Sequence, residues 1–118
     1  MLKKQAISNK LMEKIVLGSF ETVQINSRKI KAKIDSGADG SSICTSIIKS
    51  LELKPLGKKI KIKSSHGATK RELFLGEIII KGKKLTIEFT AIDRSKLNAK
   101  ILIGKDILKK GFLVDVSK

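Results

Sequence analysis

The sequence has 118 residues, which suits one domain with a modest core, and 41% of them are hydrophobic. Lys and Arg number 26 against 11 Asp and Glu, and the net charge of +15 predicts anionic partners such as nucleic acid, acidic lipid or acidic peptide. Only three of the basic residues are Arg, and Trp and Tyr are absent, so nucleic acid is not the expected main partner.

The N-terminal third of the chain predicts a short lead-in followed by a β-hairpin. Residues 1–12 are basic and have no periodic pattern, so we expect a poorly ordered lead-in, with the folded domain at 13–118. Strands are predicted at 16–17 and 21–25. Charged and apolar residues alternate over 29–34, as in a half-buried strand, and Asn26-Ser27 is the expected turn before it.

The next segment predicts a short helix over residues 41–53. Ile43, Ile47, Ile48 and Leu51 recur at helical spacing, and Ser41 or Ser42 is available as the N-cap. Pro55 and Gly57 are expected to end this helix. Cys44 falls on its apolar side, where we expect buried packing rather than nucleophilic catalysis.

The rest of the chain again predicts short strands. They are expected at residues 59–63, 72–80, 85–92, 101–103 and 112–116. A polar turn is expected at 64–70, a hairpin turn at Gly82 and a helical turn at 106–110. Many closely spaced strands with little helix predict an all-β fold, either a small barrel or a sandwich.

Two motifs carry the chemistry. The first motif is Asp35-Ser36-Gly37-Ala38, directly after the alternating strand. Its Gly lets the backbone turn sharply and expose the carboxylate. The Ser36 hydroxyl can form a hydrogen bond to a neighbouring backbone group. Alone this motif also fits an ordinary turn. About seventy residues downstream stands Ile-Leu-Ile-Gly-Lys-Asp-Ile-Leu at 101–108. Together the two motifs resemble the retropepsins, the homodimeric aspartic proteases of retroviral type.

The chain also resembles a bacterial family named ATP-dependent zinc proteases, which has a retropepsin-like fold. The similarity spans about residues 13–117 and rests on five separated motifs: Val16-Leu17-Gly18 with Glu21, residues 30–38, residues 63–67 with Arg71, residues 93–95, and residues 112–116. This family usually has Arg where the chain has Lys105. In retropepsins that Arg pairs with an acidic residue that matches Asp39, so the pair is expected to be weaker here.

The resemblance implies a small closed β-barrel of the retropepsin-like acid protease type with one or two short helices. It implies that two copies of Asp35, one from each subunit of a homodimer, share a proton and activate a water molecule, with Ser36 and Gly37 completing the catalytic loop. It places the flap that closes on substrate at residues 64–69. The residues expected to bind substrate are Ala38, Asp39, Ser65, His66, Gly67 and Arg71, and those expected to support the site are Ile103, Gly104, Lys105 and Asp106.

No metal and no cofactor are expected. The chain has one His and one Cys and no His-Glu-x-x-His motif, which is too few of the usual ligands for catalytic zinc. His66 also fits an idle, exposed residue of a polar turn. Arg71 and Arg94 could orient an anionic substrate group or form surface ion pairs. Asp93 and Asp115 are expected to cap strand ends or pair with Lys.

The leading hypothesis is an aspartic endopeptidase acting on an acidic peptide or protein. Members of the bacterial family often accompany a ligase that adds glutamates to a ribosomal protein, so the resemblance suggests trimming of glutamate-rich tails, which suits the charge. Two alternatives stay open: a non-catalytic dimerisation or binding module for acidic partners, and a basic RNA-binding barrel. The single Cys, the lack of a secretory signal and the lack of a bilayer-length apolar run predict a soluble cytoplasmic protein without a membrane partner.

Overall fold

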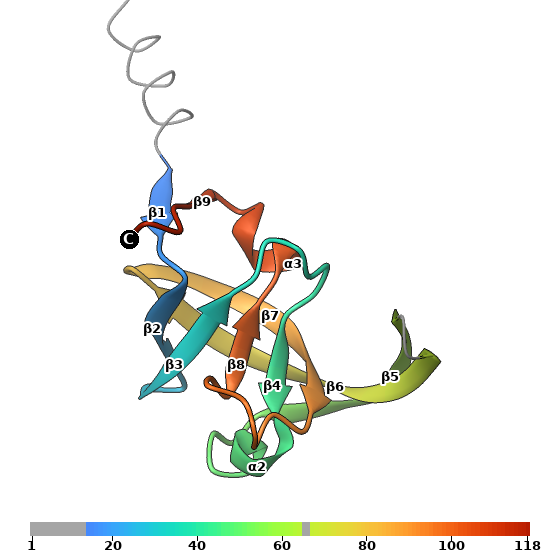
Figure 1. Cartoon of the computed structure of the whole chain (residues 1–118). Helices are drawn as coiled ribbons and strands as arrows, with labels where there is room; N and C mark the ends of the chain where they lie inside the picture. Colours follow the sequence, from blue (N-terminus) through green and yellow to red (C-terminus); the bar gives the residue numbers. More distant parts are fainter. Residues whose placement is uncertain (1–13, 65–66) are drawn as a thin grey trace, which may run out of the picture.

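The computed structural model describes residues 14–64 and 67–118. This part of the chain is almost entirely β-structure, with two helices of one turn each (Figure 1). In chain order the elements are β1 (Ile15–Leu17), β2 (Phe20–Ile25), β3 (Arg28–Ile34), β4 (Ser42–Cys44), α2 (Thr45–Ile48), β5 (Lys54–Ser64), β6 (Gly67–Ile80), β7 (Lys83–Ile92), β8 (Ile101–Ile103), α3 (Lys105–Leu108) and β9 (Phe112–Val114). The predicted lead-in at 1–12 lies outside the described residues.

Six of the strands close into a barrel. The strands follow the order β2-β3-β8-β4-β7-β6-β5 in the sheet. β2 also pairs with β6, so the first six strands of this order form a closed ring. Among the described strands, β5 pairs with β6 alone. The two strands form a long hairpin that extends beyond the barrel wall (Figure 1). The fold is therefore the small closed all-β barrel that the resemblance implied, and not the sandwich that the strand pattern had left open.

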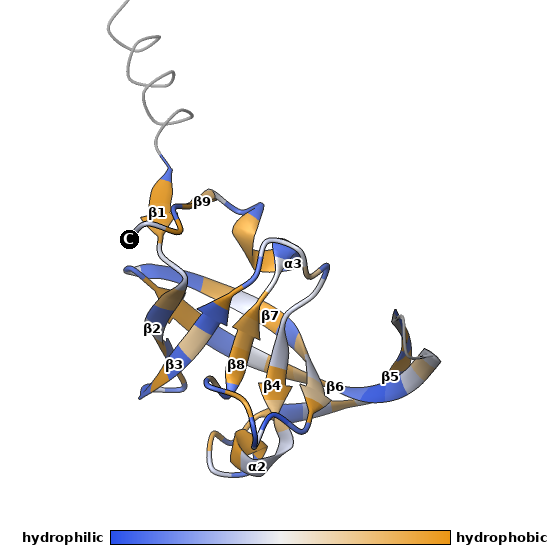
Figure 2. Cartoon of the chain, viewed as in Figure 1, coloured by the Kyte–Doolittle hydropathy of each residue, from blue (hydrophilic) through white to orange (hydrophobic). Residues whose placement is uncertain are grey.

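Aliphatic side chains fill the barrel. The strands carry apolar residues on the inside and Lys on the outside, as the mixture of colours along β3 and β6 shows (Figure 2). In β3 the exposed lysines alternate with Ile30, Ala32 and Ile34, of which Ala32 and Ile34 are buried, as the period of a half-buried strand requires. Phe89 on β7 is the largest fully buried side chain of the described residues.

The two ends of the described chain lie together at one end of the barrel. β1 pairs in parallel with β9, with Ile15 opposite Phe112 and Leu17 opposite Val114. The backbone N–H of Asp115 donates to the carbonyl of Leu17 at 2.8 Å. This small sheet lies beside α3 and leaves Leu113 and Val116 exposed.

Two hairpin turns match the sequence prediction. Asn26 and Ser27 have φ values of 48° and 71°, and Lys81 and Gly82 have φ values of 49° and 82°. Two consecutive left-handed residues are what a two-residue turn needs in order to follow the right-handed twist of its strands. Both turns therefore lie where the sequence predicted them, and β7 begins two residues earlier than expected, at Lys83.

The predicted helix over 41–53 is wrong at its start. Residues 42–44 form β4, which pairs with β7 on one side and β8 on the other, and only Thr45–Ile48 is helical. The helix is capped by Cys44 without a side-chain hydrogen bond, and not by Ser41 or Ser42. All three residues of β4 are buried, so a central strand gains more from pairing on both sides than a short Ile- and Thr-rich helix would.

The segment after this helix also differs from the prediction. Pro55 and Gly57 do not end a helix but lie at an irregularity inside β5, where Gly57 has a φ of 72°. The polar turn expected at 64–70 is shorter, because Ser64 pairs with Gly67 and residues 67–70 belong to β6. Among residues 14–64 and 67–118, no helix is long and apolar enough to cross a membrane.

Candidate active site

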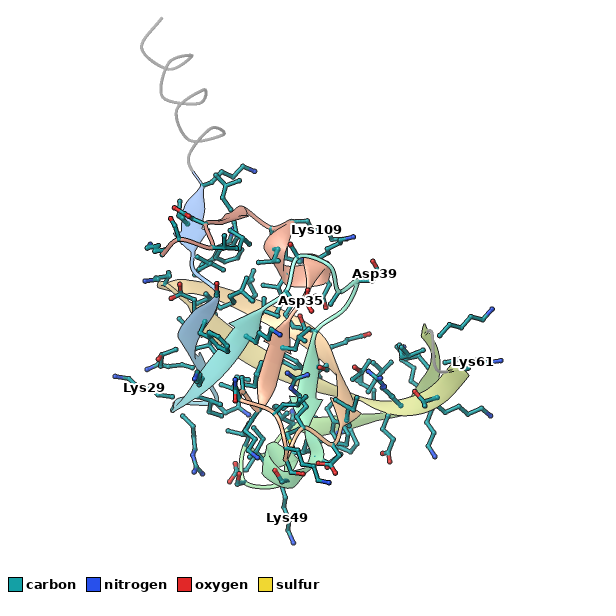
Figure 3. All side chains as sticks on the ribbon, in the orientation of Figure 1. Lys29, Asp35, Asp39, Lys49, Lys61 and Lys109 are labelled. Carbon is teal, nitrogen blue, oxygen red and sulfur yellow. The ribbon has the colours of Figure 1, made fainter. Side chains whose placement is uncertain are left out.

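Asp35 lies at the carboxyl end of β3, where the barrel opens toward α3 (Figure 3). Its backbone N–H donates to the carbonyl of Ile103 at the end of the neighbouring strand β8, at 2.9 Å. The N–H of Gly37 donates to Asp35 Oδ1 at 2.9 Å, and the N–H of Ala38 donates to the Asp35 carbonyl at 3.2 Å. The carboxylate is thus fixed by a tight turn and stays partly open to solvent.

The loop after Asp35 rests on the start of α3. The N–H of Lys105 donates to the carbonyl of Ala38 at 2.8 Å, and the N–H of Asp106 donates to the carbonyl of Asp39 at 3.2 Å. Gly104 lies directly beneath the loop, where an added Cβ would come within 2.5 Å of the Gly40 carbonyl oxygen and 2.8 Å of the Ala38 carbonyl oxygen. Only glycine allows the two segments to approach this closely.

A hydrogen-bond network joins the end of the loop to α3. The Ser41 hydroxyl donates to Asp106 Oδ1 at 2.7 Å and accepts the N–H of Gly104 at 2.9 Å, while the Ser41 N–H donates to Asp106 Oδ2 at 3.1 Å. Asp106 Oδ1 also accepts the N–H of Ile107. The predicted support residues Gly104 and Asp106 thus contact the loop directly, whereas Ser41, which sequence reasoning placed in a helix cap, was missed.

Asp39 and Lys105 form the ion pair that the sequence suggested. Lys105 Nζ lies 3.7 Å from Asp39 Oδ1, and the two side chains are 57% and 98% exposed. An exposed pair of this kind contributes at most about 1 kcal/mol, so the backbone contacts and the Ser41–Asp106 network hold the loop. Ser36 is exposed, and its hydroxyl has no hydrogen-bond partner among the described residues.

A cleft of about 890 Å³ opens between the Asp35 loop and the β5–β6 hairpin. The loop lines one side with residues 37–40, and the hairpin lines the other with residues 60–63 and Arg71. The remaining lining residues are Ser42, Thr90, Ile92, Arg94 and Leu102. Lys61 lies on the extended part of the hairpin (Figure 3). Volume and position both suit a site for an extended peptide segment.

The predicted substrate-binding residues fall into three groups. Ala38, Asp39 and Arg71 line the cleft. Gly67 begins β6 at the tip of the hairpin, with a φ of 112°. Ser65 and His66 lie outside the described residues. The cleft also contains Arg94, which the sequence analysis named for its motif but did not place among the substrate-binding residues.

Arg94 is unusual because it is an almost fully buried cation, 6% exposed, in the wall of the cleft. Its Nε donates to the carbonyl of Ala99 at 2.9 Å. The pKa of Arg94 is lowered, mainly by burial. The negative charges that Cys44 and Asp35 can carry act in the opposite direction. The positive charge of Arg71 lowers the pKa further. Arg94 is thus electrostatically coupled both to Asp35 and to Arg71.

Cys44 is buried, as predicted, although it lies in β4 and not on a helix. Its sulfur accepts the backbone N–H of Arg94 at 3.2 Å and contacts the Ser46 hydroxyl at 3.2 Å. Burial raises the pKa of the Cys44 thiol, but the hydrogen bonds from Ser46 and Arg94 and the charge of Lys100 outweigh it, so the net shift is downward. These contacts help to hold the Arg94 backbone in place.

Asp93 and Asp115 accept hydrogen bonds within their own turns, and neither forms an ion pair with Lys among the described residues. Asp93 Oδ1 accepts the N–H of Ser95 at 2.9 Å. Asp115 Oδ1 accepts both the N–H and the hydroxyl of Ser117, at 3.0 and 2.6 Å. In both cases the bonds from the serine lower the pKa of the aspartate.

A comparison of the sequence with models of known protein families identifies the family of this chain. The family model described as "gag-polyprotein putative aspartyl protease" matches residues 21–110, which include the Asp35 loop, the hairpin, the cleft and α3. The chain belongs to this aspartyl protease family. No curated protein matches the sequence significantly.

Solved structures show the same retropepsin-like fold. A Legionella pneumophila protein of unknown function (DUF785) superposes with a TM-score of 0.66 at 18% identity, over 88% of this chain and 95% of that one. EIAV protease in complex with an inhibitor gives 0.61 at 22% identity, over 84% and 88%. Simian foamy virus (mac) protease gives 0.58 at 21% identity, over 76% and 91%. At these identities the similarity concerns the fold of an aspartyl protease domain.

Proposed function

We propose that the protein is an aspartic endopeptidase whose catalytic pair consists of Asp35 from each of two identical subunits. The observation that carries the proposal is the placement of Asp35. Its carboxylate is fixed by the Gly37 N–H, in a loop braced on α3, beside a cleft of about 890 Å³ that the β5–β6 hairpin overhangs. A family of aspartyl proteases and a retropepsin-like barrel support this reading.

The reaction requires two carboxylates that share one proton. The ionised Asp35 takes a proton from water, the resulting hydroxide attacks the scissile carbonyl carbon, and the protonated Asp35 donates its hydrogen bond to the carbonyl oxygen. Proton transfer to the leaving nitrogen then allows the C–N bond to break. The Gly37 N–H holds the carboxylate of its own chain in place, because it donates to Oδ1.

A second subunit is required because one chain does not provide the pair. Among the described residues, Asp39 is the one carboxylate in the cleft lining, and it is 98% exposed and paired with Lys105. The exposed Ser36 hydroxyl has no partner within the described chain and is available to bond the loop of a second copy. A twofold dimer places two identical loops face to face.

We assign the substrate to acidic peptide segments, with glutamate-rich protein tails as the first candidate, and the compartment to the cytoplasm. The net charge of +15 favours association with an acidic chain. The resemblance to the bacterial family that accompanies a glutamate-adding ligase also supports this substrate.

The test is hydrolysis of a peptide panel, with glutamate-rich and neutral members, by wild type and by Asp35→Asn at matched dimer concentration. Glu77→Gln is the control, because it removes an exposed carboxylate on β6 that pairs with Lys84 away from the cleft. Loss of a catalytic carboxylate is expected to reduce kcat by at least about 10³-fold, and the control is expected to retain activity.

Each outcome decides between specific readings. Cleavage that survives in Asp35→Asn would show that Asp35 is not catalytic. A dimeric wild-type protein that cleaves no member of the panel would favour a non-catalytic binding module. Equal cleavage of neutral and glutamate-rich peptides would remove the substrate assignment while keeping the protease.

A further inference from the structure

The cleft beside Asp35 has a strongly basic wall. Its charged lining residues are one acidic residue, Asp39, and four basic residues: Lys61, Lys63, Arg71 and Arg94. The lysines are exposed on β5, whereas Arg71 is half-buried on β6 and Arg94 is buried in the loop after β7. The two arginines therefore lie deepest in the wall and lose the most hydration.

Neither guanidinium is neutralised within the described chain. The ion pairs found among residues 14–64 and 67–118 are Lys81–Glu21, Lys84–Glu77 and Lys105–Asp39, and none includes Arg71 or Arg94. The two arginines are nevertheless close enough for the charge of Arg71 to lower the pKa of Arg94. The charge of Asp35 acts on Arg94 in the opposite direction, but no carboxylate among the described residues forms an ion pair with either guanidinium. An anion bound to both arginines would therefore lower their mutual repulsion.

The terminal nitrogens of the Arg94 guanidinium make no hydrogen bond within the described chain. Its side-chain hydrogen bond within the described chain is from Nε to the Ala99 carbonyl, which leaves both terminal nitrogens without a partner. Among the described residues, every fully buried side-chain nitrogen or oxygen has a hydrogen-bond partner. The two terminal nitrogens of Arg94 have none, so they are not fully buried. Arg94 lines the cleft, so the cleft is the open space identified beside it.

The position of Arg94 is fixed before any ligand arrives. Its N–H bonds the Cys44 sulfur, its Nε bonds the Ala99 carbonyl, and its own carbonyl accepts the N–H of Leu97 at 3.0 Å. A guanidinium held through Nε presents its two terminal NH₂ groups as a planar fork, which matches the two oxygens of a carboxylate. Little side-chain entropy is lost when a carboxylate binds a fork that is already in place.

We infer that Arg94 and Arg71 form a carboxylate-binding subsite of the cleft, which selects a substrate residue with an acidic group next to the scissile bond. This rests on the proposed function, because the subsite adjoins the Asp35 loop. The carboxylate can come from a glutamate or aspartate side chain or from the free C-terminus of a peptide. In both cases the bound carboxylate forms the ion pair that neither arginine has among the described residues.

The test measures binding and cleavage separately. Fluorescence anisotropy of labelled hexaglutamate and hexaglutamine is measured in an Asp35→Asn background, so that the bound peptide stays intact. Arg71→Gln and Arg94→Lys are the test variants, and Arg28→Gln is the matched control, because it removes an exposed guanidinium outside the cleft lining. Arg94→Lys keeps the charge and loses the fork, so it also limits the risk of misfolding.

We expect Arg71→Gln and Arg94→Lys each to weaken hexaglutamate binding by about tenfold or more, the usual size of a charged hydrogen bond, and Arg28→Gln to change it less than twofold. Hexaglutamate with an amidated C-terminus separates the two sources of the carboxylate. Retained binding assigns the subsite to the side chain, and lost binding assigns it to the C-terminus. Equal losses in all three Arg variants, or equal binding of hexaglutamine, would overturn the inference.

Cleavage by the Asp35-containing enzyme distinguishes this inference from the proposed function. If Arg71→Gln lowers kcat/KM for glutamate peptides and leaves neutral peptides unchanged, both stand. If binding depends on Arg71 and Arg94 but no peptide is cleaved, the subsite stands without the protease. If cleavage depends on Asp35 while the arginine variants act like wild type on every peptide, the protease stands and the subsite falls.

Discussion

Replacing Ser41 by Ala tests whether the Ser41–Asp106 network holds the catalytic loop. Ser41 is 1% exposed, and its hydroxyl makes two hydrogen bonds: it donates to Asp106 Oδ1 and accepts the buried N–H of Gly104. Alanine fills nearly the same space, so the change removes the bonds and leaves packing almost intact. The Gly104 N–H is then left buried without a partner.

The expected cost follows from these two bonds. A lost hydrogen bond to a partly buried carboxylate costs about 1–2 kcal/mol, and an unpaired buried N–H costs about 1–3 kcal/mol, so the free energy of unfolding should fall by about 3 kcal/mol. An unfolding entropy of about 2 cal/mol/K per residue gives roughly 0.25 kcal/mol per degree for 118 residues. The melting temperature should therefore fall by about 12 °C.

Ser42→Ala is the matched control. Ser42 is the next residue, is 6% exposed and lines the cleft, but its hydroxyl has no hydrogen-bond partner among the described residues. Its replacement should change the free energy of unfolding by less than about 0.5 kcal/mol. Both variants are unfolded by urea and by heat at the same protein concentration, since dimerisation makes the melting temperature concentration-dependent. If Ser41→Ala is no less stable than Ser42→Ala, the network does not hold the loop.

Two further predictions concern the loop floor and the C-terminal turn. Gly104→Ala should lower the free energy of unfolding by about 3 kcal/mol or prevent folding, because its Cβ would meet two backbone carbonyls. The control is Gly40→Ala, since no atom lies within 4 Å of an added Cβ there. Urea unfolding should show that this control is nearly as stable as wild type. The hydrogen bonds from Ser117 lower the pKa of Asp115 in the folded state. The ionised Asp115 therefore stabilises the fold at pH values above its unfolded pKa of about 3.9. This stabilisation is lost as the pH falls through the lower pKa of the folded state. Asp115→Asn should therefore lower the melting temperature at pH 7 and match wild type at pH 2; an equal deficit at both pH values would refute the assigned cause.

The sequence alone predicted those features that depend on local pattern. The alternation over 29–34 predicted β3 and its buried face, because a strand with one face in solvent shows a period of two. Asn26-Ser27 and Gly82 marked both hairpin turns, because few residues adopt a positive φ at low cost. The two motifs at 35–41 and 101–108 predicted the site loop and its support through their resemblance to the retropepsins, and the close approach of Gly104 to the loop gives the physical reason for a glycine there.

Other features were decided only by tertiary structure. Residues 42–44 are buried on both sides between β7 and β8, so no polar face shows their period, and sequence reasoning placed them in a helix. The Ser41–Asp106 contact joins residues 65 positions apart, and a serine has no pattern that indicates such a partner. The sequence left Arg94 either as a residue that orients an anionic group or as part of a surface ion pair, and only closure of the barrel buries it beside Arg71 and Asp35. Local periodicity records how each residue meets solvent, whereas the partners of a buried polar group depend on which distant strands the fold brings together.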